Sequence, residues 1–136
     1  MVEGSWSGQD CVLVGGGPSL GAFNWEILAA HPRVIVVNRA FQQAPTAQIF
    51  FTEDLDFIEQ FAPLLYKFKG LKVFHCLDDA YRSRALAAVP DLHVVERVRP
   101  DKFWSKSFSD GLSYSSNSMI GALNIADLLG AFRIYL

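Results

Sequence analysis

Short runs of mainly apolar residues recur along the chain, and longer stretches with apolar residues at helical spacing separate most of them. Each run has four or five residues and shows little alternation of apolar with polar positions. A strand with both faces buried has this pattern, and a sheet with both faces covered is typically parallel. The runs are Cys11–Val14, Val34–Val37, Ala47–Phe51, Leu71–Phe74, Leu92–Val95 and Arg133–Leu136.

Helices are expected between these runs. The helical spacing covers Leu20–His31, Leu55–Leu65, Asp79–Ala88 and Asn117–Leu129. The second helix is expected to close near Lys69 and Gly70, and Pro63 is expected to kink or shorten it. Strands that alternate with helices indicate an α/β fold. We therefore predict a Rossmann-like three-layer sandwich with a mostly parallel sheet of about six strands, formed by residues 1–136 as a single domain.

Composition narrows the class of protein. The chain has 136 residues, of which 51% are hydrophobic and 19% charged, so a buried core is expected and disorder is excluded. The net charge of −2 offers no basic surface for nucleic acid, and no apolar run approaches the length of a membrane span. Two cysteines, Cys11 and Cys76, are too few for a disulfide framework and are expected to be small buried hydrophobic residues. These features predict a soluble, cytoplasmic protein that binds neither nucleic acid nor membrane.

A glycine-rich turn follows the first predicted strand and consists of Gly15, Gly16, Gly17, Pro18 and Ser19. In parallel sheets the first strand-to-helix turn is the usual place for a phosphate, because free N–H groups at the helix N-terminus favour an anion. Glycine lets a ligand approach the main chain closely, proline suits the first helical position, and the serine adds a hydroxyl. The turn therefore predicts a phosphate or nucleotide cradle, with a plain tight turn as the alternative.

The turn matches neither of the two common nucleotide loops. Leu20 stands where the dinucleotide motif needs its third glycine. Asn38 and Arg39 close the second strand, where an acidic residue would bind a ribose. A P-loop would need a lysine, and this turn has none. NAD is therefore disfavoured as a ligand.

Two blocks at opposite ends of the chain resemble known families. Val12–Leu20 resembles the opening of the MptE-like 6-hydroxymethylpterin diphosphokinase family and of the bacterial lipooligosaccharide sialyltransferases, and Ser115–Leu136 resembles a later motif of both. Short phage and prophage proteins carry the same two blocks. The resemblance implies that Gly17, Ser19 and their neighbours hold nucleotide phosphates, and that Asn38 helps to bind a sugar nucleotide.

Acidic residues follow the third predicted strand. Thr52–Asp56 resembles the Thr-Asp-Leu-Asp or Gly-Asp-x-Asp signature of pterin and thiamin diphosphokinases, which implies that Asp54 and Asp56 bind Mg²⁺ and a diphosphate. The residues alone support a second interpretation, in which Asp54 is the N-cap of the following helix and Glu53 and Asp56 favour its positive end. Simple surface charge is the third interpretation.

The last helix begins after a polar turn, where Ser116 or Asn117 is expected to be the N-cap or to contact the far end of the same ligand. Residues 98–116 have no clear period, so they form a candidate functional connection. Basic and aromatic residues in and beside this stretch are expected either to clamp phosphates and stack a base or to form a solvated face. They are Arg97, Arg99, Lys102, Trp104 and Lys106.

The end of the chain supports further expectations. The last helix is apolar almost all round, which predicts burial under further sequence or against a second copy of the chain, and hence a homo-oligomer. Arg133–Leu136 is apolar enough to be a central strand. The families named above continue past this strand, so the resemblance implies a C-terminal segment beyond Leu136, which in the sialyltransferases holds the catalytic histidine. The chain's own histidines, His31, His75 and His93, have no carboxylate or cysteine at ligand spacing and are expected to be structural or exposed.

Together these observations predict a nucleotide-binding transferase domain. The resemblance implies magnesium-dependent diphosphoryl transfer from a nucleoside triphosphate, as in the MptE-like family. A glycosyltransferase that uses a sugar nucleotide, related to the sialyltransferases, is the second interpretation. A catalytically inactive phage-type domain that binds a nucleotide or a partner is the third.

Overall fold

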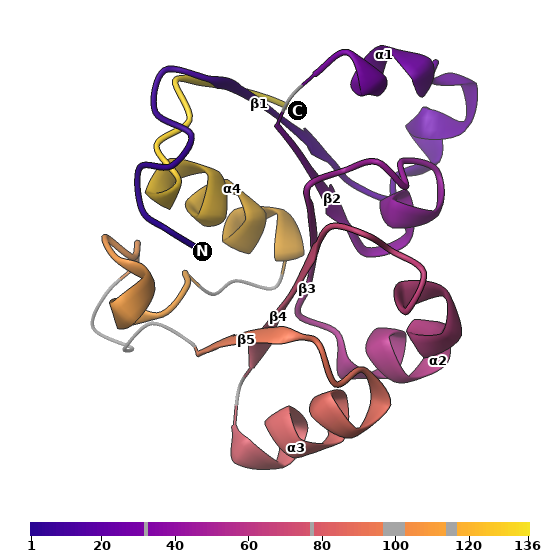
Figure 1. The fold of residues 1–136 in the computed structure, drawn as a ribbon, viewed down its shortest axis with the longest axis vertical. Helices are drawn as coiled ribbons and strands as arrows, with labels where there is room; N and C mark the ends of the chain where they lie inside the picture. Colours follow the sequence, from indigo (N-terminus) through magenta and orange to yellow (C-terminus); the bar gives the residue numbers. More distant parts are fainter. Residues whose placement is uncertain (32, 77, 97–102, 114–116) are drawn as a thin grey trace.

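The computed structural model describes residues 1–136 apart from 32, 77, 97–102 and 114–116 (Figure 1). Within the described residues, six strands form one sheet in the order β5-β4-β3-β2-β1-β6, and all neighbouring strands are parallel. The predicted α/β architecture is therefore confirmed. The strands are β1 Asp10–Val14, β2 Val34–Val37, β3 Ile49–Thr52, β4 Leu71–Cys76, β5 His93–Glu96 and β6 Arg133–Tyr135.

The order of the strands reverses beside β1. From β1 to β5 each new strand is added on the same side, and the chain then returns to place β6 on the other side of β1. β6 is therefore an edge strand, and the prediction of a central position from its apolar sequence is wrong. In open α/β sheets, ligands bind beyond the carboxyl ends of the strands at such a reversal, which here lies next to Gly15.

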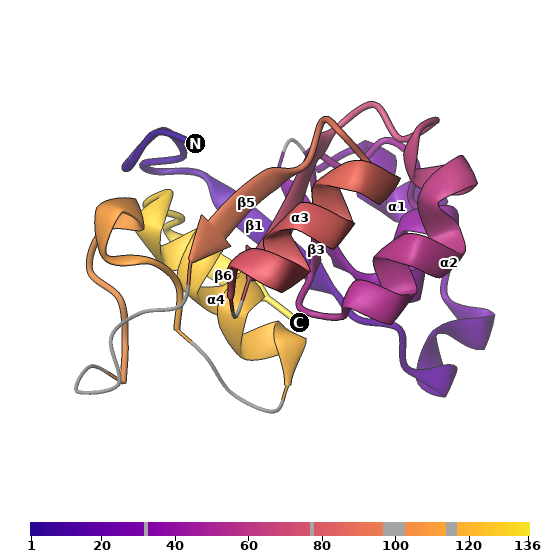
Figure 2. The same cartoon turned by 90° about the horizontal axis from the view of Figure 1, so that it is seen from below.

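Helices cover both faces of the sheet. α1 Glu26–Ala29, α2 Leu55–Leu65 and α3 Asp79–Ala88 lie on one face, and α4 Ser118–Leu128 lies on the other (Figure 1, Figure 2). α3 has the predicted bounds. α2 begins at Leu55 as predicted but ends at Leu65, before the predicted close near Lys69, and α4 is one residue shorter at each end than predicted. None of the helices in the described part of the chain is long and apolar enough to cross a membrane.

The single helix predicted over Leu20–His31 is wrong. The chain instead forms a 3-10 turn, Pro18–Ala22, followed by the four residues of α1. Phe23 lies between them in an extended conformation, with φ −73° and ψ 135°. Asn24 Oδ1 then accepts a hydrogen bond from the Glu26 N–H at 3.1 Å. An asparagine that binds the backbone two residues later stabilises a turn at the expense of a continuous helix.

Successive residues of a strand point to opposite faces, so each strand contributes to two cores. In β2, Val34 and Val36 pack in the core under α1–α3, whereas Ile35 and Val37 pack in the core under α4. All four are buried, as their continuous apolar run predicts. Aromatic rings fill much of the first core. Those in contact are Phe41, Phe50, Phe57, Phe61 and Phe68.

The N-terminal segment packs against the end of α4. The Gly4 N–H donates to the Leu128 carbonyl at 3.0 Å, and the Trp6 N–H donates to the Leu129 carbonyl at 2.7 Å. Most residues of α4 between Gly121 and Leu128 are buried. The exposed helix surface that predicts self-association is therefore not found in the described part of the chain, and self-association itself stays a prediction.

Candidate functional site

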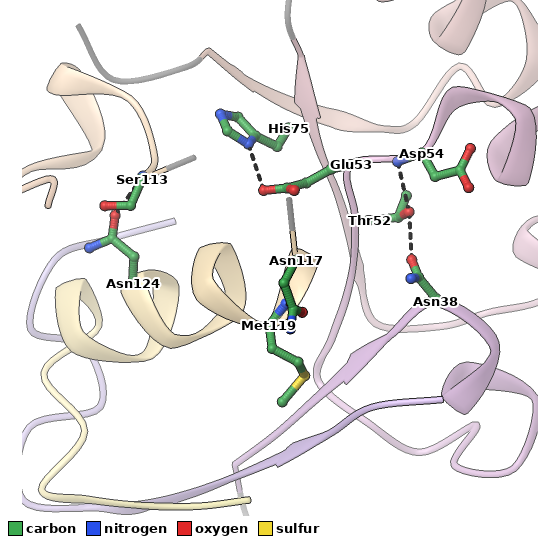
Figure 3. Close-up of polar contacts among 9 residues, drawn as sticks. All are labelled: Asn38, Thr52, Glu53, Asp54, His75, Ser113, Asn117, Met119 and Asn124. Atoms are coloured by element: carbon green, nitrogen blue, oxygen red, sulfur yellow. Dashed lines mark hydrogen bonds and ion pairs between the residues drawn. The ribbon is translucent and has the colours of Figure 1, made fainter. Parts of the chain in front are cut away.

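The carboxyl ends of the strands meet at one edge of the sheet, because the strands are parallel (Figure 3). The first turns of α4 lie along this edge and contact both of its halves. A Cβ built on Gly15 would lie 3.5 Å from the Met119 sulfur, and one built on Gly121 would lie 3.0 Å from Glu53 Oε1. Polar or glycine residues end or follow the four strands β1–β4 here. They are Gly15, Asn38, Glu53 and His75.

A cleft of about 360 Å³ opens beside the glycine-rich turn. The residues that line it include Gly15–Gly17, Trp25, Arg39, Gln42 and Gln43. The cleft lies beyond the carboxyl ends of β1 and β2, next to the reversal of strand order. Its size is within the range of small-molecule sites. Gly15–Pro18 of the predicted cradle therefore line a cleft at the place where this class of sheet binds ligands, whereas Asn38 is not among the residues that line it.

The fold itself does not require glycine at positions 15 and 16. Neither residue has a φ in the left-handed region, and Gly17 has φ −69° and ψ 151°, which any residue adopts. A Cβ on Gly15 or Gly16 would meet its nearest neighbours at 3.5 and 3.8 Å, which are ordinary contact distances. A glycine that the fold does not need lowers stability by about 0.4–1 kcal/mol. Glycine at these positions would allow a ligand to approach the main chain closely.

The glycine-rich turn is followed by the 3-10 segment Pro18–Ala22, where the sequence predicts the start of a long helix. Pro18 is its first residue, as predicted. Five residues of 3-10 helix have only a small dipole. A phosphate in the cleft would therefore be bound by main-chain N–H groups and by Arg39, and a helix macrodipole would contribute little. Ser19 belongs to the 3-10 turn, but its side chain is outside the described part of the structure.

Arg39 is a residue of this site to which sequence reasoning gave no role. Among the described residues that line the cleft, it is the one with a charged side chain. Its guanidinium carbon lies over the Phe61 ring, 5.2 Å from the centroid. Phe61 in turn stacks on Phe57, with 4.4 Å between ring centroids. The sequence holds a signal for this role: an arginine directly after the second strand, where dinucleotide-binding proteins have an acidic residue.

Asn38 has a φ of 52°, which is uncommon for a residue with a side chain. The Thr52 hydroxyl donates to Asn38 Oδ1 at 2.7 Å, and its oxygen accepts a hydrogen bond from the Asp54 N–H at 3.1 Å (Figure 3). Thr52 is fully buried, so these bonds fix the Asn38 amide against β3. With Oδ1 bound to Thr52, Nδ2 is the amide atom that can donate to a ligand.

The acidic residues after β3 point in different directions. Asp54 Oδ1 accepts from the Phe57 N–H at 3.0 Å, so Asp54 caps α2, as the capping interpretation predicts. Asp56 is exposed, and after Glu59 it contributes to raising the pKa of Arg84 on α3, so it lies on the α3 side of α2. Neither aspartate lines the cleft, and the described residues contain no cluster of three or more His, Cys, Asp or Glu suited to a metal ion. A magnesium site is thus not preformed at Asp54 and Asp56, and magnesium binding stays a prediction.

Glu53 forms a pair with His75 that the sequence did not predict. Glu53 Oε1 and His75 Nδ1 are 2.9 Å apart (Figure 3), and the His75 side chain is fully buried. Glu53 is not at ligand spacing from His75 in the sequence, and the buried, hydrogen-bonded His75 agrees with the expectation that this histidine is structural. A Cβ on Gly121 would lie 2.5 Å from Phe51 Cζ and 3.0 Å from Glu53 Oε1, so glycine is required there by packing. The pair links the end of β3 to β4 next to α4, and it is an interaction within the fold.

Asn117 caps α4, as predicted. Its Oδ1 accepts a hydrogen bond from the Met119 N–H at 2.9 Å. Ser116, the other predicted cap or ligand-binding residue, is outside the described residues. The same holds for Arg97, Arg99 and Lys102 of the basic stretch.

The part of the basic and aromatic stretch that the structure describes packs on α4. The Trp104 indole N–H donates to Asp127 at 2.7 Å, near the end of α4 that is far from the cleft. The buried Asn124 side chain accepts from the Ser113 N–H at 2.9 Å and donates to the Ser105 carbonyl at 3.1 Å (Figure 3 shows Ser113 and Asn124). These bonds hold residues 105–113 to the helix, so a structural role is established for this part.

Comparison of the chain with protein-family models, curated proteins and solved structures finds no match. The resemblance to the MptE-like family and to the sialyltransferases therefore stays a prediction that rests on two sequence blocks. Function is therefore inferred from the residues and geometry of the site.

Proposed function

We propose that this chain is the nucleotide-binding domain of a transferase, and that the phosphates of its donor occupy the cleft beside Gly15–Gly17. The observation that carries this proposal is the exposed glycine main chain in a cleft of about 360 Å³ at the carboxyl ends of β1 and β2. Neither the backbone conformation nor the packing requires glycine at positions 15 and 16. Phosphate oxygens that accept hydrogen bonds from the main chain need such a surface.

The walls of the cleft provide the other groups that a nucleotide needs. Arg39 supplies a positive charge for a phosphate. Asn38 precedes Arg39 in the chain but is not among the residues that line the cleft. Trp25 presents an aromatic surface for a base, and the amides of Gln42 and Gln43 can bind the polar edge of a base or sugar. Diphosphoryl and glycosyl transfer both require that the phosphate-bearing part of the donor is oriented and its charge balanced. The proposal therefore covers the donor half of either reaction.

Isothermal titration calorimetry with nucleosides and with their 5′-phosphates tests the proposal. We expect binding to require the phosphate, and inorganic phosphate to compete with the nucleotide. Absence of binding by every nucleotide at millimolar concentration would refute the proposal. Phosphorus NMR of the bound nucleotides and sugar nucleotides over time then separates a transferase, which consumes its donor, from a domain that only binds.

A further inference from the structure

We propose that Arg39, oriented by the ring of Phe61, balances the phosphate charge in this cleft, and that nucleotide binding there does not depend on magnesium. The inference rests on the proposed function and deepens it by naming the ligand class, a nucleotide with one or two phosphates. It departs from the magnesium-dependent triphosphate chemistry that the sequence resemblance implies.

The carboxylates that could hold a metal ion make other interactions within the fold. Asp54 caps α2 through the Phe57 N–H at 3.0 Å, and Glu53 is paired with His75 at 2.9 Å. Asp56 lies toward Arg84 on α3, whereas the cleft lies over β1 and β2. Magnesium binds phosphates in proteins through one or two carboxylates placed at those phosphates. None of the residues that the structure places around the cleft is a carboxylate.

Arg39 is placed to balance phosphate charge itself. The backbone N and the Cβ of Arg39 would each lie 3.8 Å from a Cβ built on Gly16, so Arg39 lies beside the main chain of Gly16. A guanidinium offers two parallel N–H donors to one phosphate, which a lysine cannot do. One guanidinium carries a single positive charge, so a triphosphate would leave more negative charge unbalanced in the cleft than a mono- or diphosphate does.

Phe61 limits the positions that the Arg39 side chain can adopt. The guanidinium carbon is 5.2 Å from the centre of the Phe61 ring, a distance at which a cation and a ring attract each other. The ring is itself fixed by stacking on Phe57 at 4.4 Å. Phe57 and Phe61 therefore lie on the side of α2 toward Arg39. Asp56 and Glu59 lie on the side toward Arg84.

Calorimetric titrations with the mono-, di- and triphosphates of adenosine and of cytidine, in excess Mg²⁺ and in excess EDTA, test the inference. For a mono- or diphosphate we expect affinities that agree within about twofold between the two conditions. In EDTA we expect the triphosphate to bind no more tightly than the diphosphate. Arg39→Gln should weaken binding about tenfold or more, the effect of losing a charged hydrogen bond, and Arg39→Lys should lie between. Phe61→Leu should weaken it about two- to fivefold, and Phe61→Tyr, which keeps the ring, should restore it.

Two variants serve as matched controls. Arg84→Gln removes the same charge at an exposed site on α3, where Arg84 binds Glu59, and should leave nucleotide affinity unchanged. Asp54→Asn keeps a good helix cap while removing a carboxylate, and should also leave affinity unchanged.

The outcomes separate the inference from the proposed function. Binding that needs Mg²⁺ and loses this need in Asp54→Asn would overturn the inference and leave the proposed function in place. Undiminished affinity in Arg39→Gln would overturn it as well. If no nucleotide binds in either condition, the proposed function itself fails, because the glycine cleft then has no phosphate ligand.

Discussion

Replacement of Gly16 by alanine should raise the stability of the protein and weaken nucleotide binding. The added methyl group would lie 3.8 Å from its nearest neighbours, the N and Cβ of Arg39, so the folded chain accommodates it without strain. Alanine also reduces the freedom of the unfolded chain, which should increase the free energy of unfolding by about 0.4–1 kcal/mol. For a domain of this size we expect the Tm to rise by about 1–4 °C.

The same methyl group would cover main chain that a phosphate must approach. Loss of one hydrogen bond between the main chain and an ionised phosphate corresponds to about 1.5–3 kcal/mol, or at least about tenfold in affinity. Differential scanning calorimetry measures the first effect and isothermal titration the second.

Gly121→Ala is the matched comparison for this variant. Its methyl group would lie 2.5 Å from Phe51 Cζ and 2.8 Å from Phe51 Cε1, so the same substitution should lower stability by about 1–3 kcal/mol. The reasoning would be refuted if Gly16→Ala lowered the Tm or left nucleotide affinity unchanged, because Gly16 would then serve the fold and not a ligand.

Three further predictions concern interactions that stabilise the fold. Asp54→Ala removes the cap of α2 and should lower the free energy of unfolding by about 1 kcal/mol in urea titrations, with most of the loss recovered in Asp54→Asn. His75→Phe keeps a ring but leaves Glu53 without this hydrogen bond, and should lower stability by about 1–3 kcal/mol in the same assay. Arg133 holds the pKa of Asp10 below its ordinary value, so Arg133→Gln should raise that pKa in an NMR titration. Because the folded-state pKa is lowered, the pair stabilises the fold fully at neutral pH, and this contribution is lost as the pH falls through the folded-state pKa of Asp10.

The sheet could be predicted from sequence because each buried strand carries its own pattern. Val34–Val37 is apolar at every position, and both of its faces are covered. A helix was predicted over Leu20–His31 because its apolar residues have the spacing of one helix face, but the chain does not form that helix. Leu20, Phe23 and Leu28 all pack in one core, although Phe23 is extended. The spacing thus identified residues that contact this core but not the backbone conformation, and Ile27, at the same spacing, is 51% exposed. The turn formed by Asn24 interrupts the helix.

The two halves of the candidate site differ in how far sequence could predict them. The glycine-rich turn is contiguous and follows a strand, so its place at the carboxyl edge follows from local pattern. The Glu53–His75 pair joins residues 22 positions apart and depends on the register of β3 with β4, in which Thr52 is opposite Phe74. Continuing that register by one residue brings Glu53 opposite His75. The predicted β4 ended at Phe74, so this neighbour was missed.

The residues at the carboxyl edge of this sheet therefore form two groups, one that makes contacts within the fold and one that lines the cleft. At β3 and β4, the polar groups are used within the fold: Asp54 caps a helix, and Glu53 is bound to the buried His75. At β1 and β2, the edge offers bare main chain at Gly15–Gly17 and an arginine held by an aromatic ring. Substitutions in the first group should act on stability, and those in the second should act on ligand affinity. A phosphate ligand at this edge is consequently expected over β1 and β2, where binding does not compete with the interactions that hold the sheet and helices together.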